Sequence, residues 1–321
     1  MGAPFQGDPR PFDPAALPVG SCETSFRRLG PVSFQEVRQR SMNIPPYWAK
    51  ARAEVSQNWG RKSDLCAWGW SAEGQAQAED HARRRLSSLL ARIEAGERLP
   101  RGYGYGNRPL REEIVDRIDA ASGGTAVVTR NAYGCLVLNT ENVLFLDIDI
   151  PRRSATGLLR SLLGGAKPSP EEKILAQLKD LLRQVGNASF RIYRTAAGYR
   201  VLATDPTYAQ GDRTVLSLLA HPLVDRAYAK LCEVQQSFRA RLTPKPWRCG
   251  CERPPSRFPF HDESDQIKYN EWLADYDHAA ATHSTCALVE EVGWGRVGSE
   301  IAPLLALHDR IARVDSGLPL A

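Results

Sequence analysis

The sequence lacks a long apolar run and paired cysteines, and each absence excludes a class of protein. No hydrophobic stretch approaches the roughly 20 residues that a membrane-spanning helix needs. The first residues lack the basic-then-apolar pattern of a secretion signal, and Gln6 stands where a myristoylation motif needs Ser or Thr. The seven cysteines are odd in number and have no paired spacing, which is typical of reduced thiols. We therefore expect a cytoplasmic protein that does not act at a membrane.

Known nucleotide-binding signatures are also missing. The glycine–tyrosine loop at 101–109 fits neither the P-loop nor the dinucleotide-binding spacing. No helicase motif is encoded, so a helicase or replication partner would have to act in trans.

What is present is an ordinary globular composition with an uneven charge. Of the 321 residues 42% are hydrophobic and 25% are charged, enough for one large or two modest domains. The net charge is +5, but residues 191–257 hold 12 Lys and Arg against 5 Asp and Glu. This segment is either a solvated basic face or a surface for phosphate-rich partners such as nucleotides or nucleic acid.

The order of the expected elements predicts an α+β fold, with a mixed or antiparallel sheet and helices on one face. We expect an irregular arm over 1–30, a mainly helical region over 31–100, an α+β catalytic-type core over 101–260 and a C-terminal extension over 261–321. Helices are expected at 33–41, 46–58, 71–95, 110–118, 154–164, 170–185, 212–220, 223–238 and 299–312. Strands are expected at 65–70, 125–129, 133–138, 143–150, 190–195, 199–204 and 285–292.

The run Asn142–Pro151 is the most informative of these strands, and we expect it to lie inside one sheet with the strands at 125–129 and 133–138. It is apolar except for Asp147 and Asp149, which lie two residues apart and so face the same way. Their Cα atoms would be roughly 6.6 Å apart. Two carboxylates at that spacing suit one or two hard divalent cations, and we expect a metal site here. The alternative is that Asp149 caps a loop and Asp147 is solvated.

Two basic features follow along the chain. A hairpin with an Ala196–Gly198 turn carries Arg194, Thr195 and Arg200, whose guanidinium and hydroxyl groups suit phosphate oxygens. An extended segment then alternates basic residues and a threonine on one face: Arg239, Arg241, Thr243 and Lys245. This edge is either a phosphate-binding surface or a basic edge strand that resists aggregation.

Over roughly residues 125–250 this order resembles the archaeo-eukaryotic primase, or primase-polymerase, superfamily. The family's Asp-x-Asp strand matches Asp147 and Asp149, and its hairpin matches 193–200 in outline. Asp225 stands where its third acidic residue follows. The family histidine has no counterpart, because Tyr199 or Arg200 occupies about that position.

The resemblance implies an RRM-like catalytic core and metal-dependent nucleotidyl transfer, or nucleotide or nucleic-acid binding, in DNA replication or repair. In that family chemistry Asp147, Asp149 and Asp225 would hold two Mg²⁺ or Mn²⁺ ions, which activate a 3′-hydroxyl. The arginines would neutralise a nucleoside triphosphate.

Two other functions remain open. The strand also resembles that of haloacid-dehalogenase-type phosphatases, in which Asp147 would be the nucleophile and Asp149 the acid/base. The remaining motif residues of such a phosphatase would be Thr195, Lys230 or Lys245, and the acidic pair Asp262 and Asp265. The third hypothesis is a non-catalytic nucleic-acid-binding module, with Trp247 and Tyr199 as stacking residues.

A short cysteine motif raises the question of zinc. Cys249 and Cys251 are separated by one residue, which is less than the usual two to four, and no second pair follows. Buried or surface thiols are the simpler interpretation.

Overall fold

The computed structural model describes residues 42–56, 62–97, 108–119, 125–151 and 168–321. These residues belong to one compact unit, Ser41–Ala321. The arm predicted at 1–30, the helices predicted at 33–41 and 154–164, and most of the glycine–tyrosine loop lie outside the described residues.

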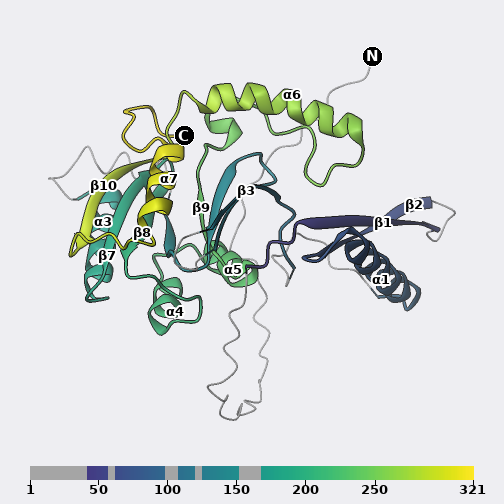
Figure 1. The fold of residues 1–321 in the computed structure, drawn as a ribbon, viewed down its shortest axis with the longest axis horizontal. Coiled ribbons are helices and arrows are strands. Elements are labelled where there is room, and N and C mark those ends of the chain that lie inside the picture. The colour runs from purple at the N-terminus through teal and green to yellow at the C-terminus, as the bar shows by residue number, and fades with distance from the viewer. Residues whose placement is uncertain (1–41, 57–61, 98–107, 120–124, 152–167) are drawn as a thin grey trace, which may run out of the picture. The chain divides into compact units, whose positions relative to one another are not determined.

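The described chain has an α+β fold, as predicted, and every pairing between its strands is antiparallel (Figure 1). The strands are β1 (Tyr47–Ser56), β2 (Lys62–Ser71), β3 (Glu113–Asp119), β4 (Thr125–Arg130), β5 (Leu136–Thr140), β6 (Phe145–Asp149), β7 (Ser189–Thr195), β8 (Gly198–Asp205), β9 (Phe238–Arg241) and β10 (Cys286–Gly293). The helices are α1 (Gln75–Glu94), α3 (Pro170–Arg183), α4 (Arg213–Leu219), α5 (Arg226–Gln235), α6 (Glu263–Ala280), α7 (Ala302–Ala312) and the short 3₁₀ helix η1 (Pro246–Arg248).

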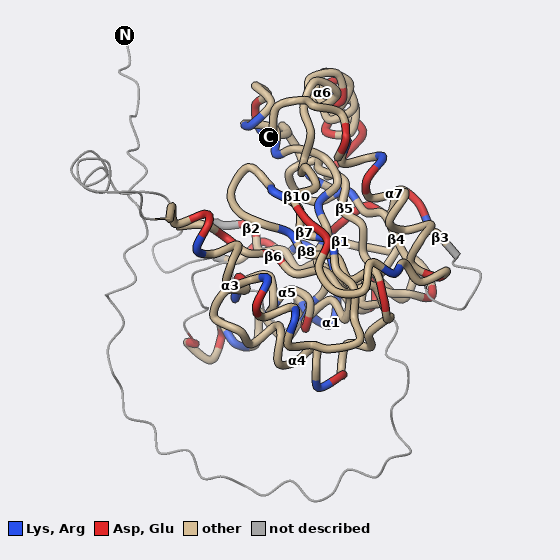
Figure 2. Tube along the Cα trace, turned by 90° about the vertical axis from the view of Figure 1, so that its left-hand side faces the viewer, with Lys and Arg blue, Asp and Glu red and all other residues tan. Residues whose placement is uncertain are grey.

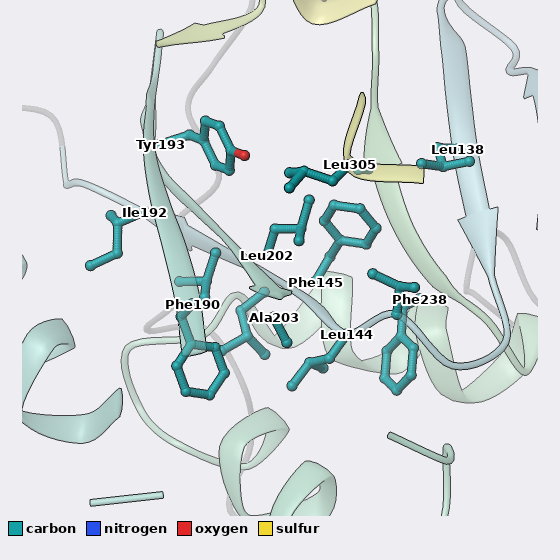
Figure 3. Packing of buried hydrophobic residues seen from close by; sticks show 14 of the residues in the cluster. Leu138, Leu144, Phe145, Phe190, Ile192, Tyr193, Leu202, Ala203, Phe238 and Leu305 are labelled. Atoms are coloured by element: carbon teal, nitrogen blue, oxygen red, sulfur yellow. The ribbon is translucent and has the colours of Figure 1, made fainter. Parts of the chain in front are cut away.

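Two four-stranded sheets share one hydrophobic core. Their strand orders are β3-β4-β5-β9 and β10-β7-β8-β6. Leu138 and Phe238 of the first sheet and Phe145 of the second are fully buried in the same cluster, with Leu305 of α7 nearby (Figure 3). Burial of large apolar side chains from both sheets is the main stabilising contribution here.

Helices cover both faces of the β10-β7-β8-β6 sheet, so the prediction of helices on one face is wrong. Tyr193 and Ile192 point to opposite sides of β7 (Figure 3). The Tyr193 hydroxyl bonds to Asp309 of α7, whereas the Tyr199 hydroxyl, on the other face, donates to the carbonyl of Glu171 in α3. β8 is buried along nearly its whole length, as expected for a strand that is covered on both sides.

The aspartate strand β6 lies at an edge. The sequence indicated three successive strands in one sheet with the aspartate strand inside it. Instead, β4 and β5 pair with each other and with β9, and the described pairing of β6 is with β8. The polar turn at Glu141–Asn142 directs the chain from one sheet into the other.

The part of 31–100 that the structure describes is not mainly helical, and the helix predicted at 46–58 is wrong. Residues 47–56 form β1, which pairs with β2. Ala49 and Ala51 face Ala78 and Ala82 of α1. Gly69 lies so close to α1 that a Cβ there would be 2.2 Å from the Ala82 nitrogen. The alternating alanines therefore serve a strand packed tightly on a helix, and their helix propensity is overridden.

Two helix boundaries also differ from the prediction. α1 begins at Gln75 rather than after Ser71, whose hydroxyl accepts from the Glu73 nitrogen in a local turn. The helix expected at 110–118 is wrong, because Glu113–Asp119 form the strand β3, with a β-bulge between Ile114 and Asp116. By contrast, α3 begins as predicted, with a capping box between Ser169 and Glu172.

Residues 261–321 are not a separate extension. β10 pairs with β7, and Val292 and Leu304 belong to the main buried cluster. The helix α6 was not predicted, and it includes His278 in its last turn. Among the described residues, no helix has both the length and the apolar character that crossing a bilayer requires.

Candidate functional site

The sheet places Asp147 in a row of polar side chains. Asp147 of β6 pairs with Arg200 of β8, which pairs with Tyr193 of β7, so these three side chains share one face. Asp149, at the end of β6, is exposed. The two aspartates are therefore not a buried like-charge pair. This removes the physical reason for expecting a cation between them.

β9, from the other sheet, adds the basic edge to Asp147. A cavity of about 170 Å³ lies where β6, β8 and β9 meet. It is lined by Asn131, Tyr133, Val137, Leu146, Asp147, Arg200, Tyr228, Leu231, Arg239, Arg241 and Lys245. We call this the basic cavity. Figure 2 shows Lys and Arg positions on the strands near the β7 and β8 labels as well as on the outer helices.

The charges in the basic cavity influence one another. Burial raises the pKa of the Asp147 carboxyl; Arg200 and Arg241 oppose this shift, and the charges of Asp149 and Asp225 add to it. Burial lowers the pKa of Lys245, and so does the neighbouring charge of Arg241. Burial, and as a smaller cause the repulsion from Arg200, lowers the pKa of Arg241. Several cations thus surround one carboxylate, and the cavity carries an excess of positive charge.

Two guanidinium nitrogens in the basic cavity have no acceptor among the described residues. Arg241 Nε and Arg239 Nη1 are buried and make no hydrogen bond. An unsatisfied buried donor costs about 1–3 kcal/mol, and more when the group is charged. An anion in the cavity would supply the missing acceptors.

Arg239 forms an ion pair with a buried carboxylate, that of Glu112. Its Nη2 atom donates to both Glu112 oxygens, at 2.7 and 2.9 Å, and the side chains of both residues are 5% exposed. Glu112 also accepts from the Thr129 hydroxyl at 2.6 Å. The ion pair fixes Nη2 of the guanidinium and leaves Nη1 without an acceptor among the described residues.

Arg200 is positioned by a buried histidine. Its Nη1 atom donates to His308 Nε2 at 3.0 Å, so the ring proton is on Nδ1, which donates to Asp309 at 2.8 Å. Asp309 also accepts from Tyr193 and Arg191. This series of hydrogen bonds links Arg200, which lines the basic cavity, to Asp309 on α7.

His308 makes stability depend on pH. Burial lowers its pKa to about 4, against an ordinary value near 6.5. The unfolded chain therefore binds a proton between pH 6.5 and 4 that the folded chain does not. We expect this group to cost about 3 kcal/mol of stability as the pH falls through that window. Urea unfolding at pH 7 and pH 4.5 measures the loss, and it should be smaller in His308→Gln. An equal loss in both proteins would contradict the assignment.

The other predicted site residues lie elsewhere. Arg194 bonds to the Gly198 carbonyl and stacks on Tyr199, on the α3 face of the sheet. The Thr195 hydroxyl accepts from the Gly198 nitrogen within the hairpin turn. The Asp225 carboxylate accepts from the Ala227 nitrogen as the N-cap of α5, and its own N–H donates to the Asp147 carbonyl. Arg200, Arg239, Arg241 and Lys245 line the basic cavity together with Asp147.

The residues present do not form the metal site that the resemblance implies. In the parts of the chain that the structure describes, no three His, Cys, Asp or Glu side chains gather to hold an ion. Asp149 is exposed, Asp225 caps a helix, and Asp147 is balanced by arginines. Cys249 and Cys251 interact with each other, and burial raises the pKa of Cys249 to about 11, which favours the thiol over a zinc-binding thiolate.

Sequence reasoning missed Glu112, His308, Tyr133 and Tyr228. Tyr228 donates to the Phe145 carbonyl at 2.8 Å and forms part of the cavity wall. No local pattern marks any of the four, because each acts through a residue distant in the sequence.

Comparison of this chain with known protein families, with curated proteins and with solved structures finds no match.

Proposed function

We propose that the basic cavity binds a phosphate group of a nucleotide or a nucleic acid. The observation that carries the proposal is the pair of buried, unpartnered guanidinium donors on Arg239 and Arg241. Guanidinium groups bind phosphate through two parallel hydrogen bonds, which are stronger than neutral ones. At about 170 Å³ the cavity is smaller than the roughly 300–1,000 Å³ typical of whole-ligand pockets. It therefore suits a phosphate group rather than an entire nucleotide.

We further propose nucleotidyl transfer as the reaction, on the resemblance to primase-polymerases. Asp147 is the carboxylate beside the bound phosphate, and a raised pKa suits a group that accepts a proton from an attacking hydroxyl. Dependence on Mg²⁺ or Mn²⁺ stays a prediction. The RRM-like core stays a prediction; the sheet that carries Asp147 has the strand order β10-β7-β8-β6, with β6 at its edge.

The contacts of the described residues do not favour the phosphatase alternative. That family needs its threonine at the end of a parallel strand, whereas Thr195 precedes the turn of an antiparallel hairpin. Its second carboxylate, Asp149, is exposed at the strand end.

Substitution of Arg241 tests the proposal. Arg241→Ala is expected to weaken binding of inorganic tripolyphosphate about 10- to 100-fold, because a charged hydrogen bond contributes about 1.5–3 kcal/mol. It should also reduce the slope of log affinity against log salt concentration by about one. Isothermal titration at several salt concentrations measures both quantities. Arg241 is preferable to Arg239, whose removal would also leave Glu112 unpaired.

The matched control is Arg183→Ala, which removes the same charge from the exposed side of α3. Arg183→Ala should bind tripolyphosphate with the same affinity as the wild type. Equal affinities in the wild type and Arg241→Ala would remove the phosphate-binding role.

A further inference from the structure

An exposed aromatic pair stands at the rim of the basic cavity. Tyr133 lines the cavity, and its ring lies 5.1 Å from that of Trp247 at an interplanar angle of 88°. The two side chains are 37% and 43% exposed. Large aromatic side chains are mostly covered in folded proteins, so two adjacent exposed rings beside a polar cavity indicate a surface for a ligand.

Two cations lie close to the ring of Trp247. Lys245 Nζ lies 5.7 Å from the centre of the Trp247 ring, and the Arg253 guanidinium carbon lies 5.2 Å from it. Lys245 also lines the basic cavity, so one side chain contacts both the aromatic pair and the proposed phosphate site. Aromatic rings with interleaved cations are the usual surface for single-stranded nucleic acid and nucleotides.

The size of the cavity decides where the rest of the ligand lies. A cavity of about 170 Å³ takes a phosphate group, and the remainder of a larger ligand must leave through the rim. Tyr133 connects the two places, because it forms part of the cavity wall and contacts Trp247. A ligand that extends along this side meets the exposed side chains of Tyr133 and Trp247.

We infer that Tyr133 and Trp247 form a stacking platform for a nucleobase, so the anion that the cavity takes is a nucleotide or a nucleotide unit of a single strand. The inference rests on the proposed phosphate site and adds the place at which the base of that ligand binds. Inorganic polyphosphates and phosphosugars gain nothing from the platform. Base recognition here is by stacking, so purines and pyrimidines should both bind.

The test compares two probes that differ in the base. Isothermal titration is run with a nucleoside triphosphate and with inorganic tripolyphosphate, for the wild type, Trp247→Ala and Trp247→Phe. Stacking on an aromatic side chain contributes about 1–3 kcal/mol per base by alanine substitution, which is about 5- to 150-fold in affinity. Trp247→Ala should lose that factor for the nucleotide and bind tripolyphosphate unchanged. Trp247→Phe should retain most of the affinity for the nucleotide.

Trp294 provides a matched control. It is 64% exposed and has the Arg296 guanidinium 5.7 Å from its ring centre, but it does not line the basic cavity. Trp294→Ala should bind both probes as the wild type does.

The other outcomes separate the two proposals. If the wild type and Trp247→Ala bind the nucleotide equally well, the platform is wrong and the phosphate site stands. If Trp247→Ala weakens both probes equally, Trp247 only supports the cavity wall, and the stacking role is wrong. If the wild type binds neither probe, the phosphate site itself fails, and the platform fails with it.

Discussion

Replacing Glu112 with alanine is expected to lower the free energy of unfolding by about 3–5 kcal/mol. Glu112 is the buried partner of Arg239, and both side chains are 5% exposed. Removing one member of a buried ion pair leaves an uncompensated charge in a medium that solvates it poorly. Here the Thr129 hydroxyl loses its acceptor as well. Urea unfolding followed by circular dichroism measures the change.

An exposed ion pair serves as the control for this prediction. Glu233→Ala removes the partner of Lys230 on α5, where the Glu233 side chain is 67% exposed, and should cost less than about 1 kcal/mol. The double variant Glu112→Leu/Arg239→Met replaces the buried pair by apolar groups and should recover part of the loss. A loss below about 1 kcal/mol in Glu112→Ala would mean that the pair does not organise this side of the cavity.

Replacing Asp147 with asparagine is expected to strengthen tripolyphosphate binding about tenfold or more at pH 8 without divalent cations. Among the described residues that line the basic cavity, Asp147 alone has an acidic side chain, and its carboxylate would repel a phosphate bound there. The gain should shrink as the pH falls, because the raised pKa of Asp147 lets the wild type become neutral at this position. Isothermal titration over a pH series measures the tripolyphosphate affinity of the wild type and Asp147→Asn. Asp180→Asn, on the exposed side of α3, is the control for the change in net charge.

The same variant separates binding from catalysis. If Asp147 accepts a proton during nucleotidyl transfer, Asp147→Asn should bind nucleotide well and lose transfer activity by about 100-fold or more. Retained activity would contradict the catalytic assignment and leave a binding module.

A third comparison repeats the titration with and without a divalent cation. If Asp147→Asn weakens triphosphate binding only when Mn²⁺ is present, a cation bridges the carboxylate and the ligand, as the primase-polymerase resemblance implies. An increase in affinity both with and without Mn²⁺ would leave that bridge without support.

Several parts of the site were predictable because their signals are local. The apolar run ending in Asp147 identifies β6, and the alternation on either side of Ala196–Gly198 identifies the β7–β8 hairpin. The capping box at Ser169 marks the start of α3. Asp262 carried a similar signal for α6, with acidic residues in the first turn, and the sequence interpretation overlooked it.

Other parts depend on partners far apart in the chain. Arg239 meets Glu112 across 127 residues, and Arg200 meets His308 across 108 residues. No local pattern specifies such pairs, because they result from how the two sheets and α7 pack around one core. Arg194 and Arg200 belong to one hairpin but lie on opposite faces of the sheet, because Arg200 pairs with Tyr193 and successive side chains of a strand alternate between the two faces.

The sequence by itself determined the α+β class, the strand that carries Asp147 and the basic residues that accompany it. Periodicity, turn residues and charge are local properties, and they are sufficient for that. Only the tertiary structure decided that Arg239 and Arg241 come from a second sheet, that Asp149 is exposed while Asp225 caps α5, and that Tyr133 meets Trp247 at the rim. These outcomes depend on which face of each sheet or helix packs against which neighbour. The packing of the whole core sets that arrangement.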